Sequence, residues 1–150
     1  MGYKLDEKDK KILEILKEHG DYTTRQIAKK TLLPVTTIHN RITKLKKEKI
    51  IKKFTIEIEP KSIDKDLMIY VLISINIEHL KEKKMSQQDV TKVLRQFYFT
   101  ERVDIVAGGT DLVAIIRVKD VEEYNNILLN KIQHVEGIRN TQSLIVIKEK

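Results

Sequence analysis

The sequence predicts an α+β protein with a helical N-terminal domain over residues 1–53 and a C-terminal sheet-containing domain over residues 66–150. Three observations predict this organisation. Apolar residues recur at helical spacing in the first fifty positions, strand-like and helix-like segments then follow in the order β-α-β-β-α-β, and the excess positive charge lies near the N-terminus. Between the domains, β-branched residues partly alternate with polar ones up to Pro60, which predicts a β-strand linker over residues 54–65.

The composition is that of a folded protein without cysteine chemistry. Of the 150 residues, 41% are apolar, and none is cysteine. No run approaches the roughly 18 apolar residues that a membrane-spanning helix needs, and the first residues lack the apolar stretch of a secretory signal. We therefore expect a soluble, cytoplasmic protein with no membrane partner. Because its four histidines lie far apart in sequence, we expect no metal site and no cofactor.

Positive charge is concentrated in the N-terminal part. The formal charge is +7, and residues 1–60 carry 15 Lys and Arg against 9 Asp and Glu, whereas residues 61–150 carry 14 against 13. Residues 22–53 hold ten basic side chains and a single acid, Glu48. This stretch predicts a surface that attracts a polyanion, with a merely solvated basic face as the alternative.

Helix start and stop signals divide the N-terminal part into three helices. Asp6 is placed to cap the first helix, and Gly20 to end it. Thr23 and Gln26 have the spacing of a capping box at the start of the second. Pro34 marks a tight turn and the start of the third. This arrangement predicts a helix-turn-helix, with a three-helix bundle used for protein contacts as the alternative.

The third helix has an aliphatic face and a polar face. At about 100° per residue, an inward stripe is formed by Val35, Ile38, Ile42 and Leu45. The side chains that point most directly outward are Thr36, Asn40, Thr43, Lys44 and Lys47, flanked by Thr37, His39 and Arg41. Asn and Arg pair with purine edges in the major groove, and Lys binds phosphate, so this face predicts contact with double-stranded DNA.

The C-terminal part alternates strands and helices. We expect a strand over residues 67–78, then a charged loop with the sequence EHLKEKK, then a helix capped by Ser86. Two strands follow at 103–107 and 112–118, joined by the glycine-rich turn GGTD. A second helix begins after Asp120 and ends at Gly137, and a last strand covers residues 144–147.

This element order predicts a ferredoxin-like sandwich with both helices on one side of an antiparallel sheet. The other side of the sheet would then be uncovered, and the first strand places Met68, Tyr70 and Leu72 there. An exposed apolar sheet face indicates a partner surface, so we predict a two-fold dimer packed sheet to sheet. The alternative is a monomer whose own loops cover this face.

The N-terminal residues also resemble a known family. The segments LDEKDKKILEILKEHGDYTTRQIAKKT and TTIHNRITKLKKEKIIKKF are similar to the start of the Lrp/AsnC (feast/famine) regulators of bacteria and archaea. The resemblance implies a winged-type helix-turn-helix followed by a RAM-type effector-sensing domain, with homodimers that assemble into tetramers, octamers or larger rings. It implies base contacts by Thr36, Thr37, His39, Asn40 and Arg41. Phosphate contacts are implied for Arg25 and Lys44, to which the charge pattern adds Lys47.

Family members usually have Gly at the positions of Leu32 and Lys49, and Ser at the position of Pro34. In the second domain, the family's Gly-x-aromatic-Asp loop corresponds to Gly108, Gly109, Thr110 and Asp111, with Thr110 in place of the aromatic residue. The resemblance implies that this loop, with Thr141 and Ser143, binds a small amino-acid-like effector between dimers. Without the resemblance, the same residues are an ordinary hairpin turn.

Other functional classes have little support in the sequence. For an enzyme, the sequence offers no nucleophile elbow, phosphate-binding glycine loop, metal-ligand spacing or close acid pair suggesting hydrolysis. RNA recognition through the sheet would need aromatic-rich strands, which are absent. We therefore hypothesise a non-enzymatic, sequence-specific DNA-binding regulator. Binding without sequence preference would instead indicate a chromatin-like architectural role.

Overall fold

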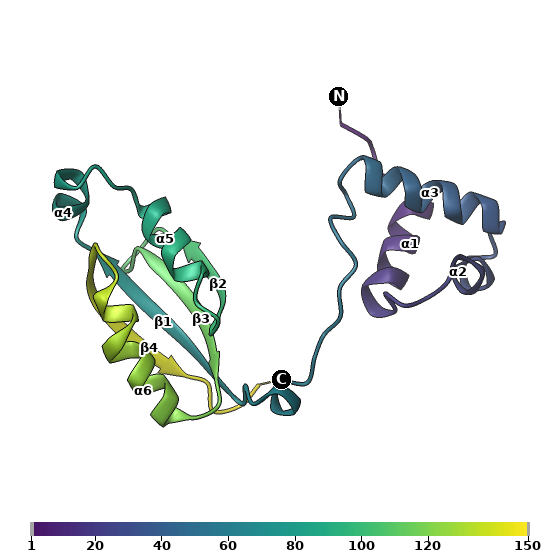
Figure 1. The fold of residues 1–150 in the computed structure, drawn as a ribbon. Coiled ribbons are helices and arrows are strands. Elements are labelled where there is room, and N and C mark those ends of the chain that lie inside the picture. Colours follow the sequence, from purple (N-terminus) through teal and green to yellow (C-terminus); the bar gives the residue numbers. More distant parts are fainter. Residues whose placement is uncertain (1, 150) are drawn as a thin grey trace. The chain divides into compact units, whose positions relative to one another are not determined.

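The structure, a computed structural model, describes residues 2–149, so positions 1 and 150 of the expected domains lie outside it. Its contacts divide the chain into two units between Glu57 and Ile58, within the expected linker. Residues 2–57 of the N-terminal unit contain three helices, α1 (Glu7–Glu18), α2 (Thr24–Thr31) and α3 (Val35–Lys47). Figure 1 shows them packed against one another. Their shared core consists of Ile12, Ile27, Ala28, Ile38 and Ile42.

The expected caps are present at the first two helices. Asp6 caps α1 in a capping box with Asp9, and Thr23 caps α2 in a capping box with Gln26. Pro34 occupies the N-cap of α3 without a side-chain hydrogen bond. Leu32, the C-cap of α2, has left-handed backbone angles of φ 58° and ψ 27°, and Lys49 also has a positive φ. These are the two positions at which the family resemblance leads us to expect Gly.

The linker differs from the expectation. Residues 52–59 form neither helix nor strand, and a short 3₁₀ turn, η1 (Pro60–Ile63), follows. The β-strand predicted within 54–65 is therefore not formed in the single chain. Apolar alternation creates a strand only where another strand supplies hydrogen-bond partners, and Phe54, Ile56 and Ile58 are exposed here.

The C-terminal unit contains one antiparallel sheet in the order β2-β3-β1-β4. Its strands are β1 (Leu67–Ile75), β2 (Thr100–Ile105), β3 (Leu112–Val118) and β4 (Ile138–Ile145). Helices α5 (Gln87–Arg95) and α6 (Val121–Asn130) cover the same face (Figure 1). The α+β fold and the ferredoxin-like order predicted from the sequence are confirmed.

Alternation in β1 explains how the core forms. Ile69, Val71, Ile73 and Ile75 are buried beneath the helices, where they meet Leu94 of α5 and other apolar side chains. Ser86 caps α5 and Asp120 caps α6, as expected.

One predicted loop is a helix. The segment expected to be a loop, EHLKEKK, lies mostly in α4 (Ile77–Glu82), so β1 ends at Ile75 and does not continue to residue 78. Asn76 caps α4, and Leu80 is buried in the core. Leu80 packs over Gly137, where an added Cβ would lie 2.3 Å from Leu80 Cδ2. Local capping and one buried leucine outweigh the charged composition.

Element ends in the second half also shift. Helix α6 stops at Asn130, and Ile132 belongs to a separate 3₁₀ turn, η2 (Ile132–His134). Strand β4 begins at Ile138, six residues before the expected start at 144, and β2 begins at Thr100. Polar residues in β4 pair with β1 by backbone hydrogen bonds, which side-chain hydropathy does not predict.

Candidate nucleic-acid interface and effector site

Helix α3 presents a polar outer surface. Its aliphatic row of Ile38, Ile42 and Leu45 is buried. The exposed outer side chains are Thr36, His39, Asn40, Thr43, Lys44 and Lys47. Val35, expected on the inner stripe, is 42% exposed and lies outside the buried core cluster.

Two of the predicted base-contacting residues have less accessible positions. Thr37 is partly buried. Arg41 Nη1 lies 2.7 Å from Asp6 Oδ2 and 2.7 Å from Asp9 Oδ1, and its side chain is only 22% exposed. In this structure, Arg41 therefore binds the start of α1, in contrast to the open base-contacting position expected from the sequence.

The carboxylates around Arg41 were not recognised as partners from the sequence. Asp9 is fully buried, and the Tyr3 hydroxyl donates to its Oδ2 at 2.6 Å. Burial acts to raise the pKa of Asp9, but hydrogen bonds from Tyr3 and Arg41 outweigh it and hold the pKa below its ordinary value. The pKa of Asp6 is lowered by the Asp9 backbone N–H and then by Arg41. The one available signal was the Asp-x-x-Asp spacing of the capping box.

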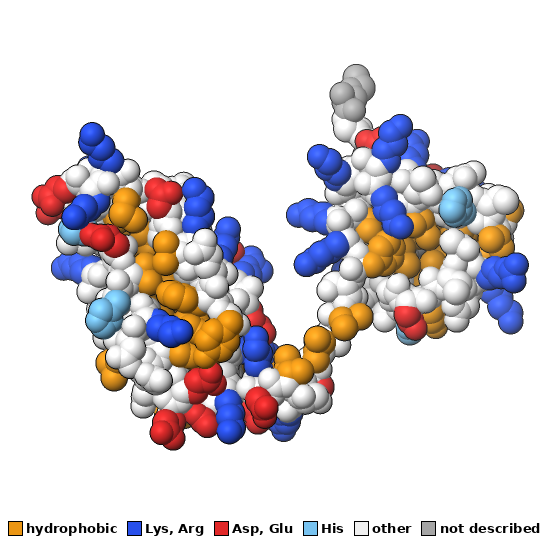
Figure 2. Space-filling model, in the orientation of Figure 1, with side chains coloured by type: hydrophobic (Ala, Val, Ile, Leu, Met, Phe, Trp, Pro, Cys, Tyr) orange, Lys and Arg blue, Asp and Glu red, His pale blue; other side chains and the backbone are white. Residues whose placement is uncertain are grey.

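Further cations surround the helix-turn-helix. Arg25, Lys29 and Lys30 of α2 are exposed. Figure 2 shows more Lys and Arg than acidic side chains on the visible face of the N-terminal unit, whereas the two signs of charge are more evenly mixed on the C-terminal unit. Lys44 Nζ lies 4.3 Å from the Tyr3 ring centroid, and Lys46 Nζ lies 4.9 Å from that of Phe54. The N-terminal unit therefore offers a positive surface around a polar helix face.

The glycine-rich loop is fixed to the end of β1. Gly108 has a positive φ of 146° and Gly109 is exposed. The Thr110 hydroxyl donates to the Ile73 carbonyl oxygen at 2.9 Å, and the Ile75 N–H donates to Asp111 Oδ2 at 2.8 Å. The loop is therefore held in one conformation by its own polar side chains.

The two candidate hydroxyl residues of β4 lie toward this end of the sheet. Thr141 pairs with Ile73, which on its other side pairs with Leu112 directly after the loop. Ser143 lies two residues further along β4, where its hydroxyl is hydrogen-bonded to that of Tyr124 in α6. Thr141 and the loop thus flank one position of β1, whereas Ser143 is already engaged.

The sheet face opposite the helices carries apolar side chains. The register aligns Tyr70 with Ile115 on one side and Leu144 on the other. Near the end of β3, the buried Arg117 binds Glu101 and Glu149. The hydrogen bond to Glu149 raises the pKa of Arg117 most, and together with Glu101 it outweighs the opposite effect of burial. The apolar residues of this open face are Met68, Tyr70, Leu72, Val113, Ile115 and Leu144.

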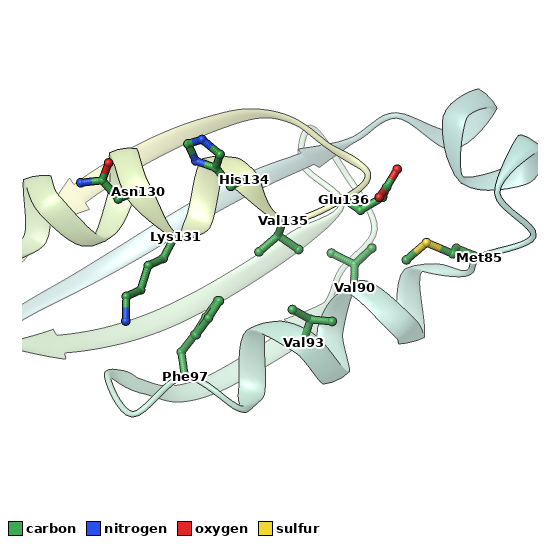
Figure 3. Close-up of a pocket in the computed structure, with 9 residues that line it drawn as sticks. All are labelled: Met85, Val90, Val93, Phe97, Asn130, Lys131, His134, Val135 and Glu136. Atoms are coloured by element: carbon green, nitrogen blue, oxygen red, sulfur yellow. The ribbon is translucent and has the colours of Figure 1, made fainter.

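A separate groove of about 450 Å³ lies between α5 and the α6–η2 segment. In Figure 3, Val90, Val93 and Phe97 form one wall, and Lys131 and Val135 come from the other. None of the predicted effector residues lines this groove.

Among residues 2–149, no helix is long and apolar enough to cross a membrane. In the same part of the chain, no group of three or more His, Asp or Glu is placed to hold a metal ion.

Comparison with known proteins assigns both units. Residues 5–52 match the model of a winged helix-turn-helix DNA-binding domain, and residues 71–150 match the Lrp/AsnC ligand binding domain. The HTH-type transcriptional regulator FL11 of Pyrococcus furiosus is 35% identical over 96% of this chain and 90% of its own length. This chain belongs to the Lrp/AsnC family of transcription regulators.

Other relatives agree with this assignment. The regulator LrpA of Pyrococcus horikoshii is 29% identical to this Lrp/AsnC protein, over 97% of the chain and 98% of its own length. A Neisseria meningitidis regulator solved as an L-Met complex has a TM-score of 0.89 at 23% identity, covering 97% of this chain and 92% of its own. E. coli AsnC has a TM-score of 0.85 at 23% identity, covering 98% and 95%. The named relatives are transcription regulators, a non-enzymatic role.

Proposed function

We propose that this Lrp/AsnC regulator reads specific sequences in double-stranded DNA through α3, and that a small amino-acid-like effector modulates its occupancy or assembly. The observation that carries the proposal is the exposure of Thr36, His39 and Asn40 on α3 while the aliphatic row of the same helix is buried. A helix with this division packs on its own domain and still offers polar groups to the major groove.

The exposed side chains suit separate tasks. The Asn40 amide has the donor and acceptor needed for a bidentate contact to adenine, and Thr36 offers a hydroxyl and a methyl group for base edges. Arg25, Lys44 and Lys47 would bind phosphates, which position the protein without reading sequence. DNA affinity should therefore fall steeply as salt rises.

A dimer would pair two reading helices. The open sheet face, centred on Tyr70, exposes apolar side chains that a second copy would bury. A two-fold dimer presents two helix-turn-helix units to half-sites about one helical turn apart. We therefore propose a palindromic operator, and assembly of dimers into larger oligomers.

The loop Gly108–Asp111 and Thr141 form the proposed effector site. Backbone N–H groups at the glycines would bind a carboxylate. Asp111 would accept an α-ammonium through Oδ1, for which no partner is present among residues 2–149, while Ile75 holds Oδ2. The Neisseria relative was solved with L-Met, which supports an amino acid as ligand class. Ser143, whose hydroxyl is hydrogen-bonded to that of Tyr124, would contribute its remaining hydrogen-bonding capacity.

The DNA-binding proposal is tested by fluorescence anisotropy with an operator selected from a random DNA pool and a scrambled duplex, across salt. We expect at least about a thousandfold preference for the operator. Lys47→Ala should weaken both complexes and reduce the salt slope by about one. Equal wild-type affinity for the two duplexes would contradict sequence-specific reading and indicate an architectural role.

The effector proposal is tested by thermal shift with a mixture of the twenty amino acids. A ligand at about 100 times its Kd should stabilise the protein by roughly 2.7 kcal/mol. Asp111→Asn keeps an oxygen for the Ile75 N–H but removes the charge, so the shift should disappear. Glu122→Gln, on exposed α6, is the matched control. A wild-type shift that persists in Asp111→Asn would place the ligand elsewhere.

A further inference from the structure

Arg41 joins α3 to the first turn of α1 through two carboxylates with different roles there. Asp6 is the N-cap of α1, and Asp9, the third residue of the helix, completes the capping box with it. Both accept from Arg41 Nη1, at 2.7 Å in each case. We call the set Tyr3, Asp6, Asp9 and Arg41 the clasp.

We propose that Arg41 is a positioning residue for DNA binding, which orients α3 through the clasp and reads no base. This inference rests on the proposed DNA-binding function. It replaces the base-contacting role that the sequence indicated for Arg41, and it adds Asp9, which is buried in the first turn of α1, to the residues on which DNA affinity depends.

Because one carboxylate of the clasp is buried, breaking the pairing between Arg41 and Asp9 would be energetically costly. Asp9 is fully buried, so its carboxylate has lost its water, and the pairing with Arg41 and Tyr3 replaces it. A bidentate contact to guanine needs two N–H groups of the guanidinium fork at a base edge. Arg41 already uses Nη1 for both carboxylates, which leaves Nη2 and Nε as its other donors, and 78% of its side-chain area is covered, since 22% is exposed. Movement of the Arg41 side chain into the DNA major groove would leave the buried Asp9 carboxylate without a cationic partner.

A second contact ties the same two segments. Tyr3 donates to Asp9, and Lys44 Nζ of α3 lies over the Tyr3 ring. Arg41 and Lys44 are three residues apart, so neighbouring positions on α3 contact the start of α1 and Tyr3 just before it. The polar face of α3 is thereby set at a fixed rotation relative to α1, which is what alignment of several side chains with base edges requires.

The clasp predicts a rescue that base reading does not. Arg41→Met leaves Asp9 buried without a cation, which should loosen α3 and weaken binding to every operator variant by a common factor of about ten. Adding Asp9→Asn to Arg41→Met removes the unpaired negative charge of the buried carboxylate and keeps a side chain of nearly the same shape. The double variant should therefore recover at least half of the lost affinity on a logarithmic scale.

The experiment measures the affinity of full-length protein for the selected operator and for each of its single-base variants, below the melting temperature of every variant. The matched control is Arg41→Met with Glu7→Gln. Glu7 lies in the same turn of α1 but pairs with Lys10, on the surface. Removal of its charge should give no rescue, so rescue by Asp9→Asn cannot come from reduced repulsion of DNA alone.

Two results would overturn the inference. One is loss of base preference at a single operator position in Arg41→Met that Asp9→Asn does not restore. The other is equal rescue by Glu7→Gln and Asp9→Asn. If wild-type protein shows no base preference at all, the proposed function fails, and the thermal stabilities of the same variants still test the clasp: the double variant should melt above Arg41→Met.

Discussion

Replacement of Leu32 by Gly should stabilise the N-terminal domain. Leu32 has a left-handed backbone (φ 58°) and is 90% exposed, so its side chain contributes almost no packing to offset the strain. The left-handed region destabilises a residue with a Cβ by about 1–2 kcal/mol. Gly removes this strain, but it lowers the stability of the folded state by about 0.5–1 kcal/mol because it increases the conformational entropy of the unfolded chain. The difference predicts a gain of about 0.5–1 kcal/mol in the free energy of unfolding.

Amide hydrogen exchange in α2 and α3 of the full chain measures this gain for the N-terminal domain separately. Opening free energies there should rise by about 0.5–1 kcal/mol, equivalent to a few degrees in Tm. Leu32→Ala is the matched control, because it removes the same exposed side chain but keeps the Cβ. If Leu32→Ala stabilises as much as Leu32→Gly, or if Gly destabilises, backbone strain is not the cause.

Three further perturbations follow from other parts of the structure. Gly137→Ala should destabilise the C-terminal domain by at least about 2 kcal/mol in chemical denaturation, because its φ is positive and its Cβ would overlap Leu80; unchanged stability would contradict this packing. Tyr70→Glu should raise the dissociation constant of the proposed dimer at least about a hundredfold in sedimentation, whereas Leu129→Glu, at an exposed position of α6, should not change it. Equal effects of the two substitutions would show that the sheet face is not the interface. The pKa of Asp9 is lower in the folded protein than its ordinary value of 3.8, so ionised Asp9 stabilises the fold at pH values above 3.8, and this contribution is lost as the pH falls through the folded pKa. The Tm advantage of wild type over Asp9→Asn should therefore shrink in acid. A difference in Tm that stays constant with pH would contradict the clasp.

Local signals in the sequence predicted the elements that depend on local physics. Asp6, Thr23, Ser86 and Asp120 each cap the helix expected of them, because a cap involves only residues within one turn. The alternation in β1 predicted which of its faces is buried, because each strand residue points to the opposite side from its neighbour. The open sheet face followed from the same pattern.

The missed features depend on contacts between residues far apart in sequence. Helical geometry placed Arg41 on the flank of α3, but its ion pairs with Asp6 and Asp9 span more than thirty residues. Helix α4 depends on the burial of Leu80 beside Gly137, and early β4 depends on backbone pairing with β1. The strand prediction for the linker was wrong because a strand-like pattern needs a partner strand, and none is present for it among residues 2–149.

Selection of bound sequences from a random DNA pool, run in parallel with wild-type protein and Asn40→Ala, tests most directly whether α3 reads bases. Wild type should enrich a palindrome with half-sites about one helical turn apart, and Asn40→Ala should lose the preference for one adenine in each half-site. Identical enriched sequences from both proteins would show that Asn40 does not read a base, and no enrichment by wild type would contradict sequence recognition by this helix.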